Sequence, residues 1–249
     1  TTNLDAPEFR VMWASADSPD VWTEVIAENP AERIYGVEAF ANGYALVLRR
    51  DGVGMVRLVS RAGGVVDVTP EDAGGLVHLG ANHNWDADSV TVIIESFLHP
   101  SVWWDVSFTG GRVERHRNQV MNVDHSGYII ERMWVPRPDG VSVPVDLMRS
   151  TTTPLDGTAA CILYGYGSYE ASCDPDWGID WWRSVPSLLD RGVVFAIGHP
   201  RGGGEMGRSW YDGGHMKTKV NTFDDQAAVG EYLLDGRVRA IVTRGLSAG

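Results

Sequence analysis

Cysteine is scarce in this sequence of 249 residues, with only Cys161 and Cys173. Two cysteines are too few for a disulfide framework or a zinc site, and we expect no metal. No stretch reaches the roughly 18 apolar residues that a membrane-spanning helix needs. Residues Thr1 to Asp5 include neither a basic segment nor an apolar one, so no secretory signal is expected. These absences predict a soluble, cytoplasmic protein.

Basic residues are also fewer than acidic ones. The sequence has 21 Lys and Arg against 33 Asp and Glu, a formal net charge of −12. Because an acidic surface repels phosphate, we expect neither nucleic acid nor a membrane as a partner, whereas a basic ligand is compatible. A charged fraction of 22% and a hydrophobic fraction of 43% are typical of globular proteins and argue against extensive disorder. The length suits one large domain or two of ordinary size.

The first half of the chain has short apolar and β-branched runs between turn residues, without a helical stripe. Asp51-Gly52 and Gly110-Gly111 lie between such runs, and a turn of this kind indicates a β-hairpin. Several short strands suit a sandwich, a barrel or propeller blades, and about two and a half blades would fit residues 1–125. Residues 1–125 contain no clear sequence repeat that would mark individual blades. The predicted strands are 44–48, 53–59, 89–94, 102–108 and 112–115.

The pattern changes near Tyr128. Later apolar runs do not alternate, which is typical of strands covered on both faces. Strands alternating with helices predict a mostly parallel, helix-covered sheet and therefore an α/β domain over residues 126–249, after a linker at about 122–130. We expect Asn221 or Thr222 to cap the last helix. The predicted strands are 128–135, 141–148, 159–164, 193–197 and 240–243, and the predicted helices are 181–190 and 223–234.

One pattern in this second half suggests catalysis. Residues 245–249, Gly-Leu-Ser-Ala-Gly, fit G-x-S-x-G and directly follow a predicted strand. In a nucleophile elbow this sequence makes a sharp, strained turn that exposes the serine hydroxyl, here that of Ser247. The next backbone N–H, that of Ala248, would then point at a developing oxyanion. Because five-residue patterns also arise by chance, an ordinary glycine-rich turn is the alternative.

Two glycine-rich loops also follow predicted strands. Residues 164–169, Tyr-Gly-Tyr-Gly-Ser-Tyr, come where open α/β sheets bind ligands. The phenol of Tyr166 could donate a hydrogen bond to an oxyanion, or its ring could simply pack on the sheet. Residues 201–205 lack the Lys-Ser/Thr of a P-loop and the G-x-G-x-x-G spacing, which disfavours nucleotide binding. We expect no cofactor.

Four titratable residues are further candidates. Asp174 and Asp176 follow the aromatic loop, and their carboxylates could receive a substrate cation or belong to a solvated turn. His199 and His215 are of the type that serves as a general base. Neither histidine has a sequence context that fixes such a role, because a histidine at the end of a strand is more often structural or exposed.

Several motifs occur together in one order and resemble the prolyl oligopeptidase family, most closely its oligopeptidase B (protease II) members. The resemblance is strong over roughly residues 120–249 and weaker, though collinear, over 1–119. Departures are Leu246 in place of the usual Gly, Glu170 after Tyr169, and Pro200 after His199. The motifs are CILYGYGSY at 161–169, SLLDRG at 187–192, HPRGGGE at 199–205, WY at 210–211, NTFDD at 221–225 and GLSAG at 245–249.

The resemblance implies a β-propeller followed by an α/β-hydrolase domain, and a cytosolic serine peptidase that cleaves short peptides after Lys or Arg. It implies that Ser247 is the nucleophile, and that Tyr166 and the Ala248 N–H form the oxyanion hole. Asp174 and Asp176 match an acidic pair near the pocket for the residue that precedes the cleaved basic one. The partners it implies are short, basic peptides.

The family's triad Asp and His lie well downstream of the serine, beyond Gly249. We therefore expect an internal fragment of a longer enzyme, with a partial propeller and a partial hydrolase domain, and we expect the 249 residues alone to be inactive. Two alternatives stay open. One is a prolyl- or acylaminoacyl-peptidase of the same fold, and the other is a non-catalytic propeller fragment that serves as an interaction module.

Overall fold

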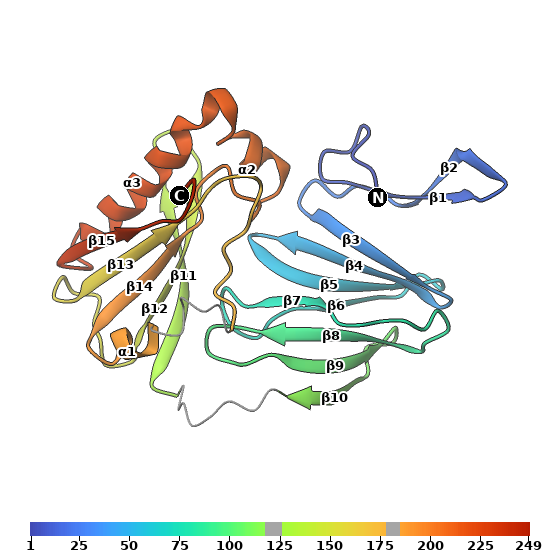
Figure 1. Ribbon diagram of the computed structural model, residues 1–249, viewed down its shortest axis with the longest axis horizontal. Helices are drawn as coiled ribbons and strands as arrows, with labels where there is room; N and C mark the ends of the chain where they lie inside the picture. Colours follow the sequence, from blue (N-terminus) through green and yellow to red (C-terminus); the bar gives the residue numbers. More distant parts are fainter. Residues whose placement is uncertain (118–125, 178–184) are drawn as a thin grey trace.

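The computed structural model describes residues 1–117, 126–177 and 185–249. Its N-terminal half consists of antiparallel sheets, and its C-terminal half is built around a five-stranded mixed sheet (Figure 1). None of the helices in these ranges is long and apolar enough to cross a membrane.

The N-terminal half contains a hairpin and two four-stranded sheets. The hairpin joins β1 (Val11–Ser15) to β2 (Ser18–Ile26). The sheets have the orders β3-β4-β5-β6 and β10-β9-β8-β7, and every neighbouring pair in them is antiparallel. Their strands are β3 (Arg33–Phe40), β4 (Gly43–Arg50), β5 (Val53–Ser60), β6 (Val65–Val68), β7 (Leu76–Leu79), β8 (Ser89–Glu95), β9 (Val102–Ser107) and β10 (Arg112–Arg117).

The predicted hairpin around Asp51-Gly52 is confirmed. Asp51 has φ +51° and Gly52 has φ +76°, so both residues are left-handed, as a two-residue turn matched to the strand twist requires. The two four-stranded sheets pack against each other through one apolar cluster, as neighbouring propeller blades do. Members of this cluster from the first sheet include Phe40 and Leu58, and members from the second include Val90 and Val106.

The C-terminal half has the strand order β11-β12-β14-β13-β15. β13, β14 and β15 are parallel, as predicted, but β11 and β12 form a hairpin that joins β14 antiparallel. The sheet is therefore mixed rather than mostly parallel, because the turn at Pro138–Gly140 folds the first two strands back on each other. Its strands are β11 (Tyr128–Pro136), β12 (Ser142–Ser150), β13 (Ala160–Gly165), β14 (Val193–Gly198) and β15 (Ala240–Arg244).

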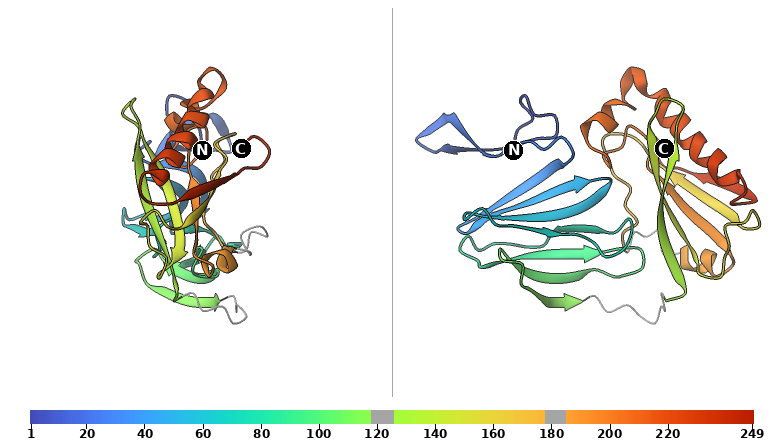
Figure 2. Two further views of the ribbon diagram at one scale, coloured as in Figure 1. Left: turned by 90° about the vertical axis from the view of Figure 1, so that its left-hand side faces the viewer. Right: turned by 180° about the vertical axis from the view of Figure 1, so that it is seen from behind.

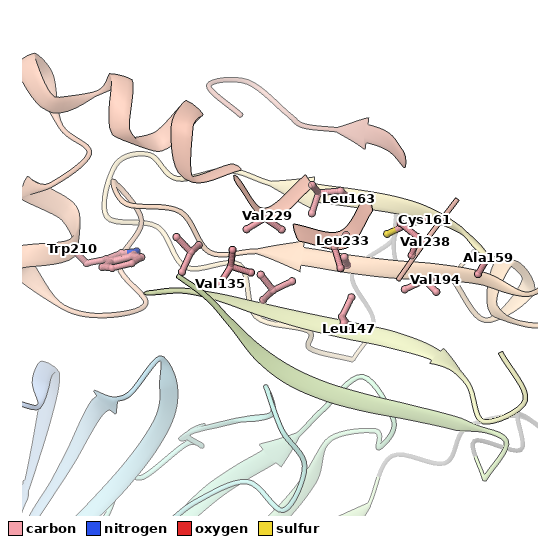
Figure 3. Packing of buried hydrophobic residues seen from close by; sticks show 13 residues of the cluster. Val135, Leu147, Ala159, Cys161, Leu163, Val194, Trp210, Val229, Leu233 and Val238 are labelled. Atoms are coloured by element: carbon pink, nitrogen blue, oxygen red, sulfur yellow. The ribbon is translucent and has the colours of Figure 1, made fainter. Parts of the chain in front are cut away.

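Apolar side chains cover both faces of this sheet. One face packs against α3 (Val220–Leu234) and α2 (Arg208–Asp212), and Leu163, Val194, Val229 and Leu233 meet there (Figure 3). The other face packs against α1 (Val185–Leu189) and takes in Phe97 from the N-terminal half. The unalternating apolar runs of β13 and β14 follow from this double burial. Figure 2 shows α3 along the outer face, away from the blades.

The ends of two helices and of one strand differ from the predicted ones. α1 confirms the end of the helix predicted over 181–190, and residues 181–184 lie outside the described ranges, as does the 125/126 domain boundary. β11 begins at Tyr128, so the last residues of the predicted linker belong to a strand. The capping prediction is wrong, because α3 begins earlier and has Lys219 at its N-cap. Asn221 and Thr222 instead donate to the carbonyls of Gly213 and Arg201.

Candidate active site

Ser247 lies in a tight turn directly after β15. Its φ is +55°, a left-handed conformation that is uncommon for a residue with a side chain. The Gly249 N–H donates to the Leu246 carbonyl at 2.9 Å and closes the turn. A Cβ on Gly245 would lie 2.5 Å from the Gly249 carbonyl carbon, so position 245 accepts only glycine. The turn therefore has the strained, exposed geometry that the G-x-S-x-G pattern predicts.

The serine turn and the aromatic loop after β13 are in contact. A Cβ on Gly249 would lie 2.6 Å from the Gly165 carbonyl oxygen and 3.1 Å from the Tyr166 Cα. β13 and β15 are parallel neighbours, so both turns leave the sheet at the same edge. The fold thus brings Ser247 and Tyr166, which are 81 positions apart in the sequence, to one place. Their chemical roles remain predictions.

A cavity of about 390 Å³ adjoins this place. Tyr211 and His215 stack on one side of it, with ring centroids 4.6 Å apart. The described lining residues include no carboxylate, so the cavity offers an aromatic and apolar surface with Lys219 as its basic group. The lining residues are Ser168, Tyr169, Tyr211, Gly214, His215, Met216, Lys219 and Ala248.

The segment that follows Tyr166 is bound to the first blade. The guanidinium of Arg33 on β3 forms an ion pair with Glu170, and that of Arg49 on β4 forms one with Asp174. The Tyr35 hydroxyl donates to the Gly204 carbonyl at 2.6 Å. Strands β3 and β4 therefore fix residues 170–174 relative to the mixed sheet.

Asp174 and Asp176 have different surroundings. Both oxygens of Asp174 accept from Arg49, one of them at 2.9 Å from Nη1. The Oδ1 atom of Asp176 is buried and has no hydrogen-bond partner among the described residues. Burial, followed by the charges of Glu95 and Asp174, raises the pKa of Asp176 to about 7. Asp176 is therefore the carboxylate of the pair that has no arginine partner among the described residues.

His199 is buried in a charged network rather than placed beside the serine. Its Nε2 lies 2.9 Å from Asp146 Oδ2, and its Nδ1 lies 3.4 Å from Glu205 Oε1. Arg132 donates two hydrogen bonds to the same Asp146 carboxylate. Burial alone would lower the pKa of His199, but hydrogen bonds to Asp146 and Glu205 outweigh it and raise the pKa to about 9. This arrangement fits the structural alternative for His199.

Sequence reasoning did not identify the contributions of Arg49 and Lys219. Arg49 lies 125 residues before Asp174, and only the tertiary fold pairs them. Lys219 does have a local signal, since it lies two residues before the NTFDD segment, but nothing in that segment indicates its target. In the described ranges, no group of three or more His, Cys, Asp and Glu side chains is arranged to hold a metal ion.

Comparison with known proteins matches both halves of the chain. Residues 1–119 match the family model of the prolyl oligopeptidase N-terminal beta-propeller domain, and residues 180–249 match that of the prolyl oligopeptidase family. Dipeptidyl aminopeptidase BI of Pseudoxanthomonas mexicana is 35% identical over 94% of this chain and 32% of its own length. Protease 2 of Moraxella lacunata is 29% identical over 100% of this chain and 36% of its own.

Solved structures agree with these matches. Oligopeptidase B from Leishmania major superposes with a TM-score of 0.88 at 26% identity, covering 99% of this chain and 36% of that one. Oligopeptidase B from Trypanosoma brucei with covalently bound antipain gives a TM-score of 0.88 at 30% identity over the same shares. The chain thus spans about a third of the length of the relatives it matches, and its sheets correspond to part of a propeller and part of a peptidase domain.

Proposed function

Because this chain belongs to the prolyl oligopeptidase family, we propose that Ser247 is the nucleophile of a serine peptidase that hydrolyses short peptides. The serine oxygen attacks the scissile carbonyl, an acyl-enzyme forms as the amine leaves, and water then releases the acyl group. The observation that carries this proposal is the left-handed Ser247 in a turn packed against the Tyr166 loop.

Tyr166 and Ala248 are proposed to form the oxyanion hole. Tyr166 is half-buried in the loop that contacts the serine turn, and Ala248 is the residue after the nucleophile. Its phenol O–H and the backbone N–H of Ala248 would both donate to the negative oxygen of the tetrahedral intermediate. Removing one such donor typically lowers kcat by about 100- to 1000-fold. We expect a loss of that size from Tyr166→Phe.

The triad Asp and His are proposed to come from a part of the protein outside these 249 residues. Within the described ranges the Ser247 hydroxyl has no hydrogen-bond partner, and His199 is committed to Asp146 and Glu205. Without a base the serine stays a poorly reactive alcohol. We therefore propose that the 249 residues alone have no peptidase activity.

A fluorophosphonate probe tests this assignment. The complete gene product should be labelled stoichiometrically at Ser247, and the 249-residue chain should not. The matched control is Ser247→Ala, which should abolish labelling. Labelling of the isolated chain would mean that another residue, such as His215 beside the cavity, serves as the base. A complete product that resists the probe would favour the non-catalytic interaction module.

We further propose that the enzyme prefers basic residues and that the acidic pair near the loop contributes to this preference. Asp176 is the stronger candidate of the two, because its buried Oδ1 has no partner whereas Asp174 is paired with Arg49. A charge-assisted hydrogen bond from a substrate cation contributes about 1.5–3 kcal/mol. Asp176→Asn should therefore raise KM for dibasic peptides more than for monobasic ones.

The pKa of Asp176 gives this proposal a second readout. Since its carboxyl group ionises near pH 7, attraction of a cationic side chain should increase as pH rises from 6 to 8. The ratio of kcat/KM for dibasic over monobasic peptides should rise over that range, and Asp176→Asn should remove the rise. Asp174→Asn is the matched variant. If it alone changes the ratio, Asp174 is the substrate ligand instead.

Prolyl or acylaminoacyl specificity is the second candidate. The observation that favours it is the aromatic and apolar lining of the cavity next to Ala248. Rates of cleavage of Arg-ended and Pro-ended chromogenic peptides distinguish the two specificities. A preference for Pro would refute the proposed basic specificity. A cytoplasmic location also belongs to the proposal, and fractionation of the source cells tests it.

A further inference from the structure

The loop that follows Tyr166 has an unusual backbone. Gly167 has φ +63°, and Tyr169 and Glu170, which both carry side chains, have φ +57° and +58°. Left-handed conformations of this kind cost of order 1–3 kcal/mol each for ordinary residues and persist only where neighbouring groups hold them. The loop therefore needs anchors, and the identity of the anchors bears on how Tyr166 is presented.

Lys219 is one of the residues that hold this loop. Its Nζ donates to the Gly167 carbonyl oxygen at 2.7 Å and to the Ser168 hydroxyl at 2.6 Å. Both acceptors come directly after Tyr166 in the chain. Thr222, one turn further along α3, approaches the same Gly167 carbonyl at 3.4 Å. The beginning of α3 thus holds the Gly167–Ser168 peptide unit, one residue beyond the tyrosine.

The location of Lys219 is unfavourable for the helix itself. A cation at a helix N-terminus faces the positive end of the helix dipole, and lysine is not a favoured N-cap residue. Burial also lowers the pKa of Lys219. Local helix stability therefore does not explain a lysine at this position. The favourable interactions that the structure shows for it are its hydrogen bonds to the loop.

Lys219 also borders the cavity beside Ala248. Its ammonium group lies 5.6 Å from the centre of the Phe223 ring, within the range of a cation–π contact. Lys219 thus contacts the loop of Tyr166 and shares a cavity with Ala248 of the serine turn, without a described contact to Ser247 or to the Tyr166 phenol.

We propose that Lys219 is a positioning residue that acts through Tyr166: by fixing the Gly167 carbonyl and the Ser168 hydroxyl, it sets the direction of the Tyr166 phenol toward the oxyanion. The proposal rests on the proposed function of Ser247 and Tyr166. It assigns no proton transfer to Lys219, and it predicts an effect on kcat rather than on substrate binding, because the oxyanion exists only after attack.

The test is a double-mutant cycle in the complete gene product with a chromogenic peptide. Lys219→Met should lower kcat by about 10- to 100-fold, somewhat less than loss of the donor itself, and change KM less than about threefold. In a Tyr166→Phe background the same substitution should lower kcat less than about twofold, because the group it positions is already absent. Lys219→Arg should restore part of kcat, and the exposed Lys217→Met is the matched control.

Two outcomes overturn the proposal. One is an unchanged kcat in Lys219→Met, and the other is an equal loss in both backgrounds, which indicates a purely structural role. If Lys219→Met does not fold, Ser168→Ala replaces it in the cycle, since it removes one of the two acceptors and keeps the lysine. Ser247→Ala separates this proposal from the proposed function, because a fully active Ser247→Ala would refute the nucleophile and with it the positioning role.

Discussion

The buried charged network around His199 predicts a specific dependence of stability on pH. His199 is 1% exposed, lies between Asp146 and Glu205, and has a pKa near 9 against about 6.5 for an unfolded histidine. The folded state therefore binds the proton more tightly than the unfolded state does. Its stabilising contribution is complete below about pH 6.5 and is lost as pH rises through 9.

Between pH 7 and pH 9 this one group should cost the folded chain roughly 2 kcal/mol of unfolding free energy. The window avoids Asp176, whose raised pKa removes stability mainly between about pH 4 and 7. It also avoids Asp146, because hydrogen bonds and the charges of Arg132 and His199 outweigh its burial and hold its pKa far below the usual range. The fall between pH 7 and 8 is therefore assigned to His199. Closer to pH 9, the thiols of Cys161 and Cys173, whose pKa burial raises to about 12, add a smaller loss of stability that should persist in His199→Gln.

Urea unfolding followed by tryptophan fluorescence measures the effect, and the ten tryptophans supply the signal. His199→Gln should lower stability at pH 7 and flatten the fall between pH 7 and 9. The matched control is His83→Gln, because His83 is exposed, and it should keep the full fall. Parallel curves for the wild type and His199→Gln would refute the reasoning, since they would show that His199 is neutral in the folded chain.

Two further predictions concern stability. Asp225 is fully buried and accepts three hydrogen bonds from Arg201. Asp225→Asn should therefore lower the free energy of unfolding in urea by about 3–5 kcal/mol. The control Asp212→Asn, which removes a charge from an exposed ion pair with Arg208, should lower it by less than about 1 kcal/mol. Equal losses would contradict this ranking. Gly167→Ala should lower the melting temperature by several degrees, because φ is +63° and a Cβ there would lie 2.5 Å from the Thr222 Cγ2; an unchanged melting temperature would show that the loop relaxes freely.

Local signals in the sequence were enough to predict most strands. The Asp51-Gly52 turn, the unalternating runs of β13 and β14, and the G-x-S-x-G turn each depend on residues close together in the chain. The parallel order of β13, β14 and β15 follows from their alternation with helices. These are features in which local conformation and tertiary packing favour the same outcome.

Features that depend on distant partners could not be predicted. Asn221 and Thr222 are good capping residues, but their side chains bond to the carbonyls of Gly213 and Arg201, and the helix begins before them. The different surroundings of the two aspartates arise in the same way. The Asp174 carboxylate is paired with Arg49, a residue of the other half of the chain. No sequence pattern around Asp174 indicates that partner.

The attachment of residues 170–174 to β3 and β4 has a consequence for how such a protein can change. Arg33 and Arg49 belong to a blade whose core is separate from the cores of the mixed sheet. Variation in the blade can therefore shift the loop that presents Tyr166 and Asp176 while the sheet and the serine turn keep their sequence. If the proposed function is correct, substitutions at positions such as 49 could change which peptides the enzyme prefers, although these positions are far from any residue that touches the scissile bond.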